Sequence, residues 1–454
     1  MAPRRIPAED ADPSPLAAPL KFEFSGKTAE NRFMKAAMTE RLSTWDAARP
    51  ERRGVPTPEL VNVYRRWGEG GFGVILTGNV MLDYDQLEAA GNPIIPPGAA
   101  FEGERFEGFR RVAEAARRHG SLVHAQLSHP GRQVAAHINP HPVSASDVQL
   151  EGEVLGMRFG KPRALSKEEI KKVVDDFAHA AEYVHRAGFD GVELHGAHGY
   201  LLAQFLSPST NRRTDEYGGP LANRARIILE IADAMRARVA DPSFSIGIKV
   251  NSVEFQEGGF STEDCRALCA ALEAHGFDFV ELSGGTYQSL AFGHRRESTR
   301  RREAFFLDFA EAVIPELKRT RAYVTGGLRT TAAMAAALGT VDGVGLARPA
   351  CNEFDLPRKL LDGEAKSAVD TLLDEDDFGI TNLLAGTHFD RMRLVGQDKE
   401  PLDVSQEKYK QVFEKSLAKW SQGMADNGDN SKYGFIDIEG TTLQPYGTPY
   451  AAAA

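Results

Sequence analysis

Short apolar runs alternate with amphipathic helical stretches eight times along this 454-residue chain, and this alternation limits the folds that it can adopt. The apolar runs lack the regular polar positions of a half-exposed strand, which predicts a parallel sheet buried on both faces. Eight such units predict a sheet closed into a (β/α)8 barrel, the TIM-barrel class of α/β fold. An open doubly wound sheet is the alternative, although no glycine-rich dinucleotide fingerprint follows the first strand.

The predicted strands are short and apolar, and a helix is predicted after each of them. The strands span Phe33–Met38, Gly73–Thr77, Leu122–Leu127, Gly191–His195, Ile246–Val250, Phe277–Leu282, Ala322–Thr325 and Val341–Ala347. The helices span Pro56–Glu69, Phe106–Arg118, Ser166 to about Ala187, Asn223–Val239, Thr262–His275, Leu307–Lys318, Thr330–Leu338 and Leu356–Leu361. Ser166 and Glu169 form the pattern of a capping box, which marks the start of the third helix.

The barrel is expected to span residues 31–365, after an N-terminal segment of residues 1–30. A long insertion, residues 128–165, follows the third strand and is expected to form a lid or a substrate wall, since loops of that length are usually functional. Residues 366–454 lie beyond the last repeat and are charged and loop-like, apart from an amphipathic stretch at Tyr409–Trp420. We therefore expect a C-terminal extension that is partly irregular.

Charge and cysteine content narrow the class of protein. The net charge of −10 argues against nonspecific binding to nucleic acid or to anionic membranes. No apolar run approaches the ~20 residues of a membrane span, and the N-terminus has no apolar signal core. Cys265, Cys269 and Cys351 are too few for a disulfide framework and are interpreted as packing thiols. These features favour a reducing compartment, and we expect a cytoplasmic protein.

His195, His198 and Tyr200 follow the fourth predicted strand, at the end of the barrel where active sites lie. Two imidazoles can donate hydrogen bonds to one carbonyl oxygen and stabilise an enolate. A tyrosine phenol is normally protonated at neutral pH and can donate a proton. A metal site is the competing interpretation, but it needs a third ligand such as Glu193 and leaves Tyr200 unexplained.

A phosphate site is predicted after the seventh and eighth strands. Gly326 and Gly327 would let backbone amides approach a phosphate, and the helix that begins near Thr330 adds positive potential. Arg348, at the end of the eighth strand, can bind phosphate through two parallel hydrogen bonds. Barrels often bind phosphate with these two loops, so the pairing carries more weight than either element alone.

The stretch from His195 to Gly219 closely resembles the signature of the old yellow enzyme family, which are flavin-dependent ene-reductases on a (β/α)8 barrel. The resemblance extends over roughly residues 20–360. It implies noncovalent FMN, reduction by NADPH or NADH, and a small-molecule enone or enal substrate, while a homo-oligomer remains open. In the family pattern the two histidines hold the substrate carbonyl and Tyr200 protonates carbon. Arg213 and Asp215 also match and are interpreted as structural.

The resemblance also implies which residues contact the flavin. The first strand would end along its central ring, the second and third strands at its polar edge, and Lys249 would stabilise negative charge on the reduced flavin. The residues implied are Ala37, Met38, Thr39, Gly78, Gln126, His195, Lys249, Gly326, Gly327, Ala347 and Arg348.

The chain departs from the family pattern at several of these positions. One subclass has Cys in place of Thr39, another has Asn in place of His198, and Lys249 replaces a commoner Arg. These departures leave the flavin potential and the shape of the substrate open. Two other functions stay open as well, a flavin-dependent NADH oxidase and, in a different class, a metal-dependent barrel hydrolase.

Overall fold

The core of the protein is a closed barrel of parallel strands. The structure is a computed structural model, and it describes residues 2–154, 157–252, 258–283, 307–373, 385–425 and 434–450. Consecutive barrel strands along the chain are neighbours in space, and the last strand pairs with the first. The strands are β3 (Phe33–Lys35), β4 (Val74–Met81), β5 (Leu122–Ser128), β10 (Gly191–Gly196), β11 (Ser245–Asn251), β12 (Phe279–Ser283), β13 (Arg321–Thr325) and β14 (Gly343–Leu346). The predicted fold class is confirmed, and the open sheet is wrong.

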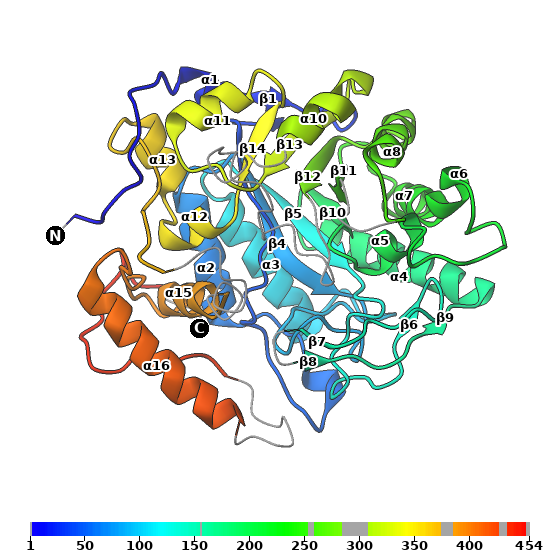
Figure 1. The fold of residues 1–454 in the computed structure, drawn as a ribbon, viewed down its shortest axis with the longest axis horizontal. Coiled ribbons are helices and arrows are strands. Elements are labelled where there is room, and N and C mark those ends of the chain that lie inside the picture. The colour runs from blue at the N-terminus through cyan, green and yellow to red at the C-terminus, as the bar shows by residue number, and fades with distance from the viewer. Residues whose placement is uncertain are drawn as a thin grey trace.

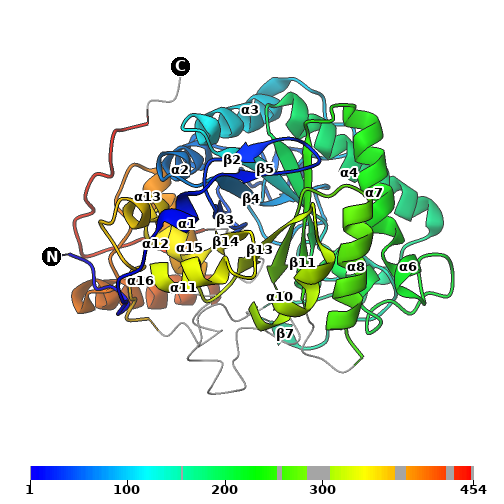
Figure 2. The ribbon, with the colours of Figure 1, turned by 90° about the horizontal axis from the view of Figure 1, so that it is seen from above.

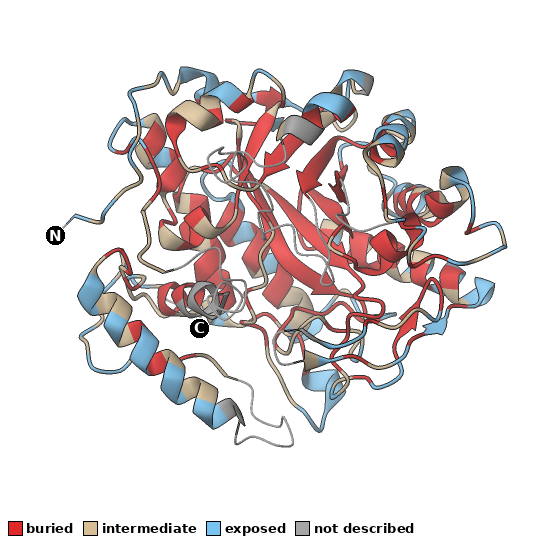
Figure 3. Cartoon of the chain, viewed as in Figure 1, coloured by how far each residue is buried: buried red, intermediate tan, exposed pale blue. Residues whose placement is uncertain are grey.

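Helices surround the barrel and bury its outer face (Figures 1 and 2). The strands are almost entirely buried, whereas the helices expose one side to solvent (Figure 3). Thr57 caps the first large helix, and the capping box predicted at Ser166 is present. The surrounding helices are α2 (Pro58–Glu69), α3 (Gly103–Arg117), α4 (Lys167–Arg186), α7 (Arg226–Val239), α8 (Thr262–Ala274), α10 (Leu307–Val313), α11 (Thr331–Ala337) and α13 (Leu356–Leu361).

Short elements complete the connections between the strands and helices. Helix α5 (Leu201–Leu206) begins directly after Tyr200, α6 (Leu221–Arg224) precedes α7, and α12 (Arg348–Asn352) follows β14. Helix α1 (Ser14–Ala17) and the hairpin of β1 (Leu20–Lys21) and β2 (Thr28–Ala29) precede the barrel.

The insertion after β5 folds into two small strand pairs. Strands β6 (Val143–Ser144) and β9 (Arg163–Ala164) pair in parallel, and β7 (Glu153–Val154) and β8 (Met157–Arg158) pair antiparallel. The Gln204 amide of α5 fastens the insertion to the barrel, since it donates to the carbonyl oxygen of Pro130 at 3.1 Å and accepts from the Ser144 hydroxyl at 2.7 Å. The insertion is thus attached to the helix that follows Tyr200.

The C-terminal extension is more regular than expected, because its described residues include two helices. They are α15 (Ala385–Gly396) and α16 (Glu407–Ala425), and the second contains the predicted amphipathic stretch. The Asp398 carboxylate fastens the extension to α2: it accepts from Arg66 at 2.8 Å and from the Asn62 amide at 2.9 Å. The same carboxylate accepts from the backbone N–H of Tyr450 at 2.7 Å. The charged composition of the extension suggested a loop, but its Asp398 carboxylate instead makes packing contacts with α2.

Two strands end further from their predicted positions than the other barrel strands do. Strand β3 ends at Lys35, not Met38, and β4 continues past Gly78 to Met81 with a register shift between Leu76 and Asn79. Gly78 therefore lies inside β4 at an irregularity, not at its end. The shift arises because the Gly78 N–H turns away to donate to Glu40 Oε1 at 2.8 Å.

Candidate active site

His195, His198 and Tyr200 meet at the carboxyl end of β10, as the sequence predicts. The ring centroid of His195 lies 5.2 Å from that of His198 and 4.5 Å from that of Tyr200, both edge to face. His195 and Tyr200 each expose only 4% of their surface. Three groups that can donate hydrogen bonds are thereby gathered in a largely dry setting, where such bonds are stronger than in water.

His198 has a strained backbone that neighbouring strands hold in place. Its φ of 57° is in the left-handed region, which a non-glycine residue rarely adopts and which is common at functional sites. The Asn251 amide oxygen, at the end of β11, accepts from its backbone N–H at 3.1 Å. Its Nε2 lies 2.9 Å from the hydroxyl of Ser283, at the end of β12. Sequence reasoning missed Asn251 and Ser283, although each directly follows a predicted barrel strand and ends the observed one.

Both imidazoles are neutral at physiological pH. Burial, with the nearby His198 and the Lys249 ammonium, holds the pKa of His195 well below its usual range. Burial and Lys249 lower the pKa of His198 to about 3. The Nδ1 of His195 accepts from the backbone N–H of Ala197 at 3.3 Å, so its single proton belongs on Nε2. The ring can therefore still donate one hydrogen bond without carrying a charge.

Charged side chains fill the barrel interior next to this cluster. The Lys249 ammonium lies 2.7 Å from Glu281 Oε1, and Lys249 and Glu281 are 3% and 0% exposed. The Gln126 amide donates to Glu193 Oε1 at 2.7 Å. Lys249 and Gln126, the two flavin contacts predicted at strands three and five, therefore each have an acidic partner that the sequence did not indicate.

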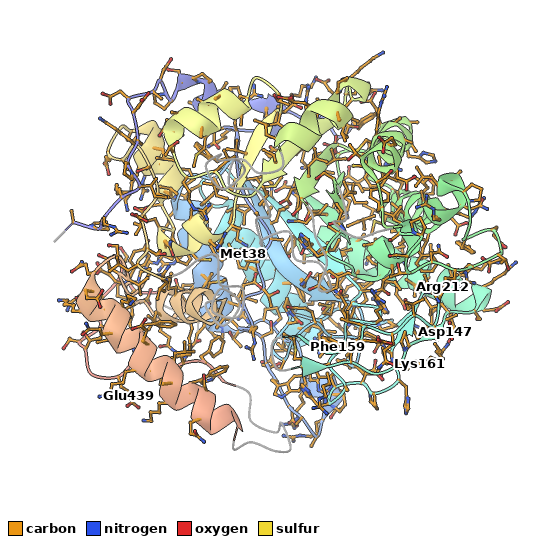
Figure 4. The ribbon with its side chains drawn as sticks, viewed as in Figure 1. Met38, Asp147, Phe159, Lys161, Arg212 and Glu439 are labelled. Carbon is orange, nitrogen blue, oxygen red and sulfur yellow. The ribbon has the colours of Figure 1, made fainter. Side chains whose placement is uncertain are left out.

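The segment after β3 brings Ala37, Met38 and Thr39 to the same end of the barrel. The Thr39 hydroxyl donates to Glu88 Oε2 at 3.0 Å, and burial raises the pKa of that carboxyl. Met38 lies near the centre of the molecule beside α12 (Figure 4), where its sulfur accepts from the Cys351 thiol at 3.3 Å. Glu88 is a further polar residue that no sequence motif identified.

Gly78 has a packing role that sequence reasoning did not anticipate. Its N–H donates to Glu40 Oε1, and a Cβ placed there would lie 2.3 Å from the Met38 carbonyl oxygen. Its own carbonyl oxygen accepts from the Thr77 hydroxyl at 2.8 Å. Both backbone groups of Gly78 thus have partners within the protein.

The ends of β13 and β14 lie side by side, and the glycines and the arginine that follow them are partly exposed. Thr325 pairs with Gly345, and Gly326 and Gly327 follow with φ values of 131° and 79° that favour glycine. Ala347 is the N-cap residue of α12, and Arg348 is the first residue of this helix. Arg348 therefore does not end the eighth strand, as the sequence had suggested. The sequence-predicted phosphate elements are therefore adjacent.

The residues present fit a bound flavin. Their strands are buried, yet Ala37, Met38, Thr39, His198, Gly326, Gly327, Ala347 and Arg348 are all partly exposed at the carboxyl end. Asn79 Oδ1 and Asn251 Nδ2 are buried polar atoms with no hydrogen-bond partner among the described residues. Donors, acceptors and a phosphate-type glycine turn around one end of a barrel are the set that a flavin mononucleotide requires.

Three further observations come from the insertion, the C-terminal extension and the described helices. Figure 4 places Phe159 and the exposed Lys161–Asp147 ion pair, 3.6 Å long, together on the insertion. In the same figure Glu439 lies apart, beside α16, where it pairs with Lys419 at 2.5 Å. Among the helices that the structure describes, none is long and apolar enough to span a membrane.

Comparison with known proteins also indicates a flavin-binding barrel. A model of the NADH:flavin oxidoreductase / NADH oxidase family matches residues 15–367. The chain is 51% identical over 396 residues to the NADH-dependent flavin oxidoreductase nadA of Aspergillus parasiticus, with 87% of this chain and 88% of that protein covered. It is 40% identical over 173 residues to 12-oxophytodienoate reductase 1 of Oryza sativa, covering 37% and 44% of the two chains. Morphinone reductase has a similar structure, with a TM-score of 0.63, 25% identity, and 81% and 95% of the two chains covered.

The protein is thus a flavin-dependent oxidoreductase on a (β/α)8 barrel. It belongs to the NADH:flavin oxidoreductase / NADH oxidase family, that of the old yellow enzymes, and this membership implies dependence on FMN and on NADH or NADPH. The alternative of a metal-dependent hydrolase is wrong, because the family match covers the whole barrel.

Proposed function

We propose that this protein is an NAD(P)H-dependent ene-reductase that holds FMN noncovalently and reduces the activated C=C bond of α,β-unsaturated carbonyl compounds. The observation that carries the proposal is the packing of His195, His198 and Tyr200 into one buried cluster of donors. A relative named for reducing an oxophytodienoate supports this class of substrate.

The two imidazoles would hold the substrate's carbonyl oxygen. His195 offers the hydrogen on Nε2, because its Nδ1 is occupied by the Ala197 N–H. His198 is oriented by Asn251 and Ser283. Two neutral donors in a buried site stabilise the negative charge that develops on that oxygen and need not reorganise during the reaction.

Tyr200 would supply the proton. Its ring packs edge to face on His195, which fixes the phenol relative to the carbonyl-binding donors. Bound FMN would supply hydride, taken from the nicotinamide, to the β-carbon of the substrate. Tyr200 then protonates the α-carbon, and the low exposure of the phenol restricts competition from water.

The remaining predicted residues would hold the cofactor. We propose that Thr39, Gln126 and Lys249 contact its ring system, and that Gly326, Gly327 and Arg348 bind its phosphate. Helix termini and glycine turns after the last two barrel strands commonly bind phosphate. The three buried cysteines support a reducing compartment, and we propose the cytoplasm.

An anaerobic titration tests the function. The purified protein should have a flavin absorbance spectrum with one FMN per chain, NADH or NADPH should bleach it, and cyclohexenone should restore it without oxygen. Protein that is colourless and cannot be reconstituted with FMN would refute the proposal. Protein that is bleached by NADH but restored only by oxygen would instead be an NADH oxidase.

A further inference from the structure

Three ionisable side chains lie together in the barrel interior, and the proposed chemistry uses only one of them. Glu193, Lys249 and Glu281 are 0%, 3% and 0% exposed. The Lys249 ammonium lies 2.7 Å from Glu281 Oε1, and the carboxyls of Glu193 and Glu281 are within hydrogen-bonding reach of each other. We call these three residues the barrel triad.

The strand register explains why the triad forms. Lys249 on β11 pairs with Glu281 on β12, while Glu193 on β10 pairs with Gly247. A Cβ at Gly247 would lie 2.2 Å from the ring of Phe279, so that ring occupies the space over Gly247. Gly247 and Lys249 are two residues apart on β11, so Glu193, Lys249 and Glu281 all lie on the same face of the sheet.

The charges of the triad cannot all be present at once. Two carboxylates and one ammonium would leave a net negative charge in a dry interior, and an unpaired buried charge is costly. Glu193 Oε2 is buried with no donor among the described residues unless a proton lies between the carboxyls. Burial and the Glu281 carboxylate raise the pKa of Glu193 well above its usual range, whereas the Lys249 ammonium helps to lower the pKa of Glu281.

Other groups that face the triad do not change this balance. His195 and His198 are neutral, Gln126 donates to Glu193, and the Thr325 hydroxyl faces Glu281. Lys35 is a further nearby cation: burial lowers its pKa to about 8, so it is charged at neutral pH, and the Glu40 carboxyl, which acts on it more strongly than Glu281 does, offsets that charge. Its ammonium donates to the Leu76 carbonyl oxygen at 2.7 Å.

We propose that the barrel triad holds one proton between Glu193 and Glu281, so that its net charge is zero, and that this balance sets the electrostatic field at the flavin site. The inference rests on the proposed function. It makes Glu193 and Glu281 positioning residues that act through Gln126 and Lys249, the side chains to which they are bonded. Lys249 is then not an isolated cation beside the flavin, because a carboxylate offsets its charge.

The shared proton predicts that the two carboxyls compensate for each other. If Glu281 becomes Gln, Glu193 can lose its proton and offset Lys249. If Glu193 becomes Gln, Glu281 already carries the negative charge. Only the double variant E193Q/E281Q leaves the ammonium without a carboxylate, and an uncompensated cation favours the negatively charged reduced flavin.

The test is the two-electron midpoint potential of the FMN-loaded protein, measured against reference dyes at about pH 6, where a buried lysine is still protonated. Each single Gln variant should change the ratio of reduced to oxidised flavin affinity by less than about threefold, whereas the double variant should raise it at least about tenfold, roughly 30 mV. Sulfite forms an anionic adduct with oxidised flavin, which an uncompensated cation would also stabilise. The affinity for sulfite should therefore rise in the double variant only.

Asp190→Asn is the matched control. Asp190 is a buried carboxylate of a Lys27 ion pair, 3.0 Å long, at the amino-terminal end of β10, away from the site. Its substitution should leave the potential unchanged.

The possible failures are distinguishable. A parent protein that binds no FMN refutes the proposed function and the inference with it. If FMN binds but E281Q alone raises the potential as much as the double variant, Glu193 does not take over the charge and the shared proton is wrong. A double variant that matches the parent also overturns the inference. If the double variant does not fold, by circular dichroism, the single variants still decide, since a tenfold effect in either one contradicts compensation.

Discussion

Two sectors of the barrel's carboxyl end differ in the chemical groups that they present. The ends of β10, β11 and β12 present buried side chains that pack on or bond to their neighbours, among them His195, Lys249 and Glu281. The ends of β13 and β14 present glycine backbone at Gly326 and a partly exposed Arg348. The first sector fixes the charges and the directions in which hydrogen bonds are donated. The second offers backbone N–H donors and the Arg348 guanidinium.

The difference suits two different tasks. A reacting carbonyl and a proton in transfer need donors whose direction and charge are fixed in a low dielectric. A phosphate group needs close backbone approach and positive potential, which tolerate exposure to water. Substitutions in the β10–β12 sector should therefore change rates, whereas substitutions in the β13–β14 sector should change cofactor affinity.

The largest effect is expected at Tyr200. Tyr200→Phe keeps the ring that packs on His195 and removes only the acid, so reduction of bound flavin by NAD(P)H should survive. Enone reduction should slow by about 10²–10⁴-fold, the range for loss of a general acid. Stopped-flow measurement of both half-reactions checks this.

A matched variant distinguishes chemistry from packing at Tyr200. Tyr217 is buried in the loop that follows α5, and its hydroxyl donates to Glu230 at 2.8 Å. Tyr217→Phe should leave both half-reactions unchanged. If Tyr200→Phe reduces cyclohexenone as fast as the parent does, the proton comes from elsewhere.

His195→Ala and His198→Ala should slow enone reduction by roughly 10- to 1,000-fold, because each removes one donor to the developing oxyanion. Flavin reduction by NAD(P)H should change less. The same stopped-flow traces measure both effects. Ser283→Ala, which removes only the hydroxyl beside His198 Nε2, should give a smaller loss of the same kind. Equal losses in the two half-reactions would mean that the histidines hold the cofactor, not the substrate.

Much of the fold and of the catalytic cluster could be predicted from the sequence. The eight strands were predictable because buried parallel strands are continuous apolar runs, and His195, His198 and Tyr200 are adjacent along the chain. The strand ends were less predictable. Tertiary hydrogen bonds from the Gly78 N–H to Glu40 and from the Gln126 N–H to the Thr77 hydroxyl decide where β4 bulges, and no local pattern encodes them.

The partners of the predicted residues could not be found in the same way. Glu281, Ser283 and Glu88 carry no motif, and each lies far along the chain from the residue that it contacts. Lys249 looked like an isolated cation because its carboxylate lies on the next strand. Helix α15 was missed because part of its stabilisation comes from packing against α2.

In the β13–β14 sector, Arg348→Ala should weaken FMN binding by about 1.5–3 kcal/mol, as expected for a hydrogen bond to a charged group. Turnover of the FMN-saturated protein should change little. Arg348→Lys keeps the charge but loses the two-pronged geometry and should give an intermediate affinity. Fluorescence titration of apoprotein with FMN measures these changes. A large fall in turnover at saturating FMN would contradict the division between the two sectors.

The smallest effect concerns acid stability and again distinguishes the sectors. His198 has a pKa of about 3 when folded, so between there and the usual value near ~6.5 only the unfolded chain binds its proton. Folding stability is therefore unaffected above that usual value and is lost as the pH falls, by at most about 1.4 kcal/mol per pH unit. His198→Asn removes this cost, and its unfolding free energy should fall by about 2.5 kcal/mol less than that of the parent between pH 6 and pH 4. Denaturant unfolding at both pH values measures the difference, and His119→Asn, at an exposed position just after α3, should not change it. If His198→Asn and the parent lose stability equally, the imidazole is already charged in the folded protein, and the assignment of two neutral donors to the β10–β12 sector is wrong.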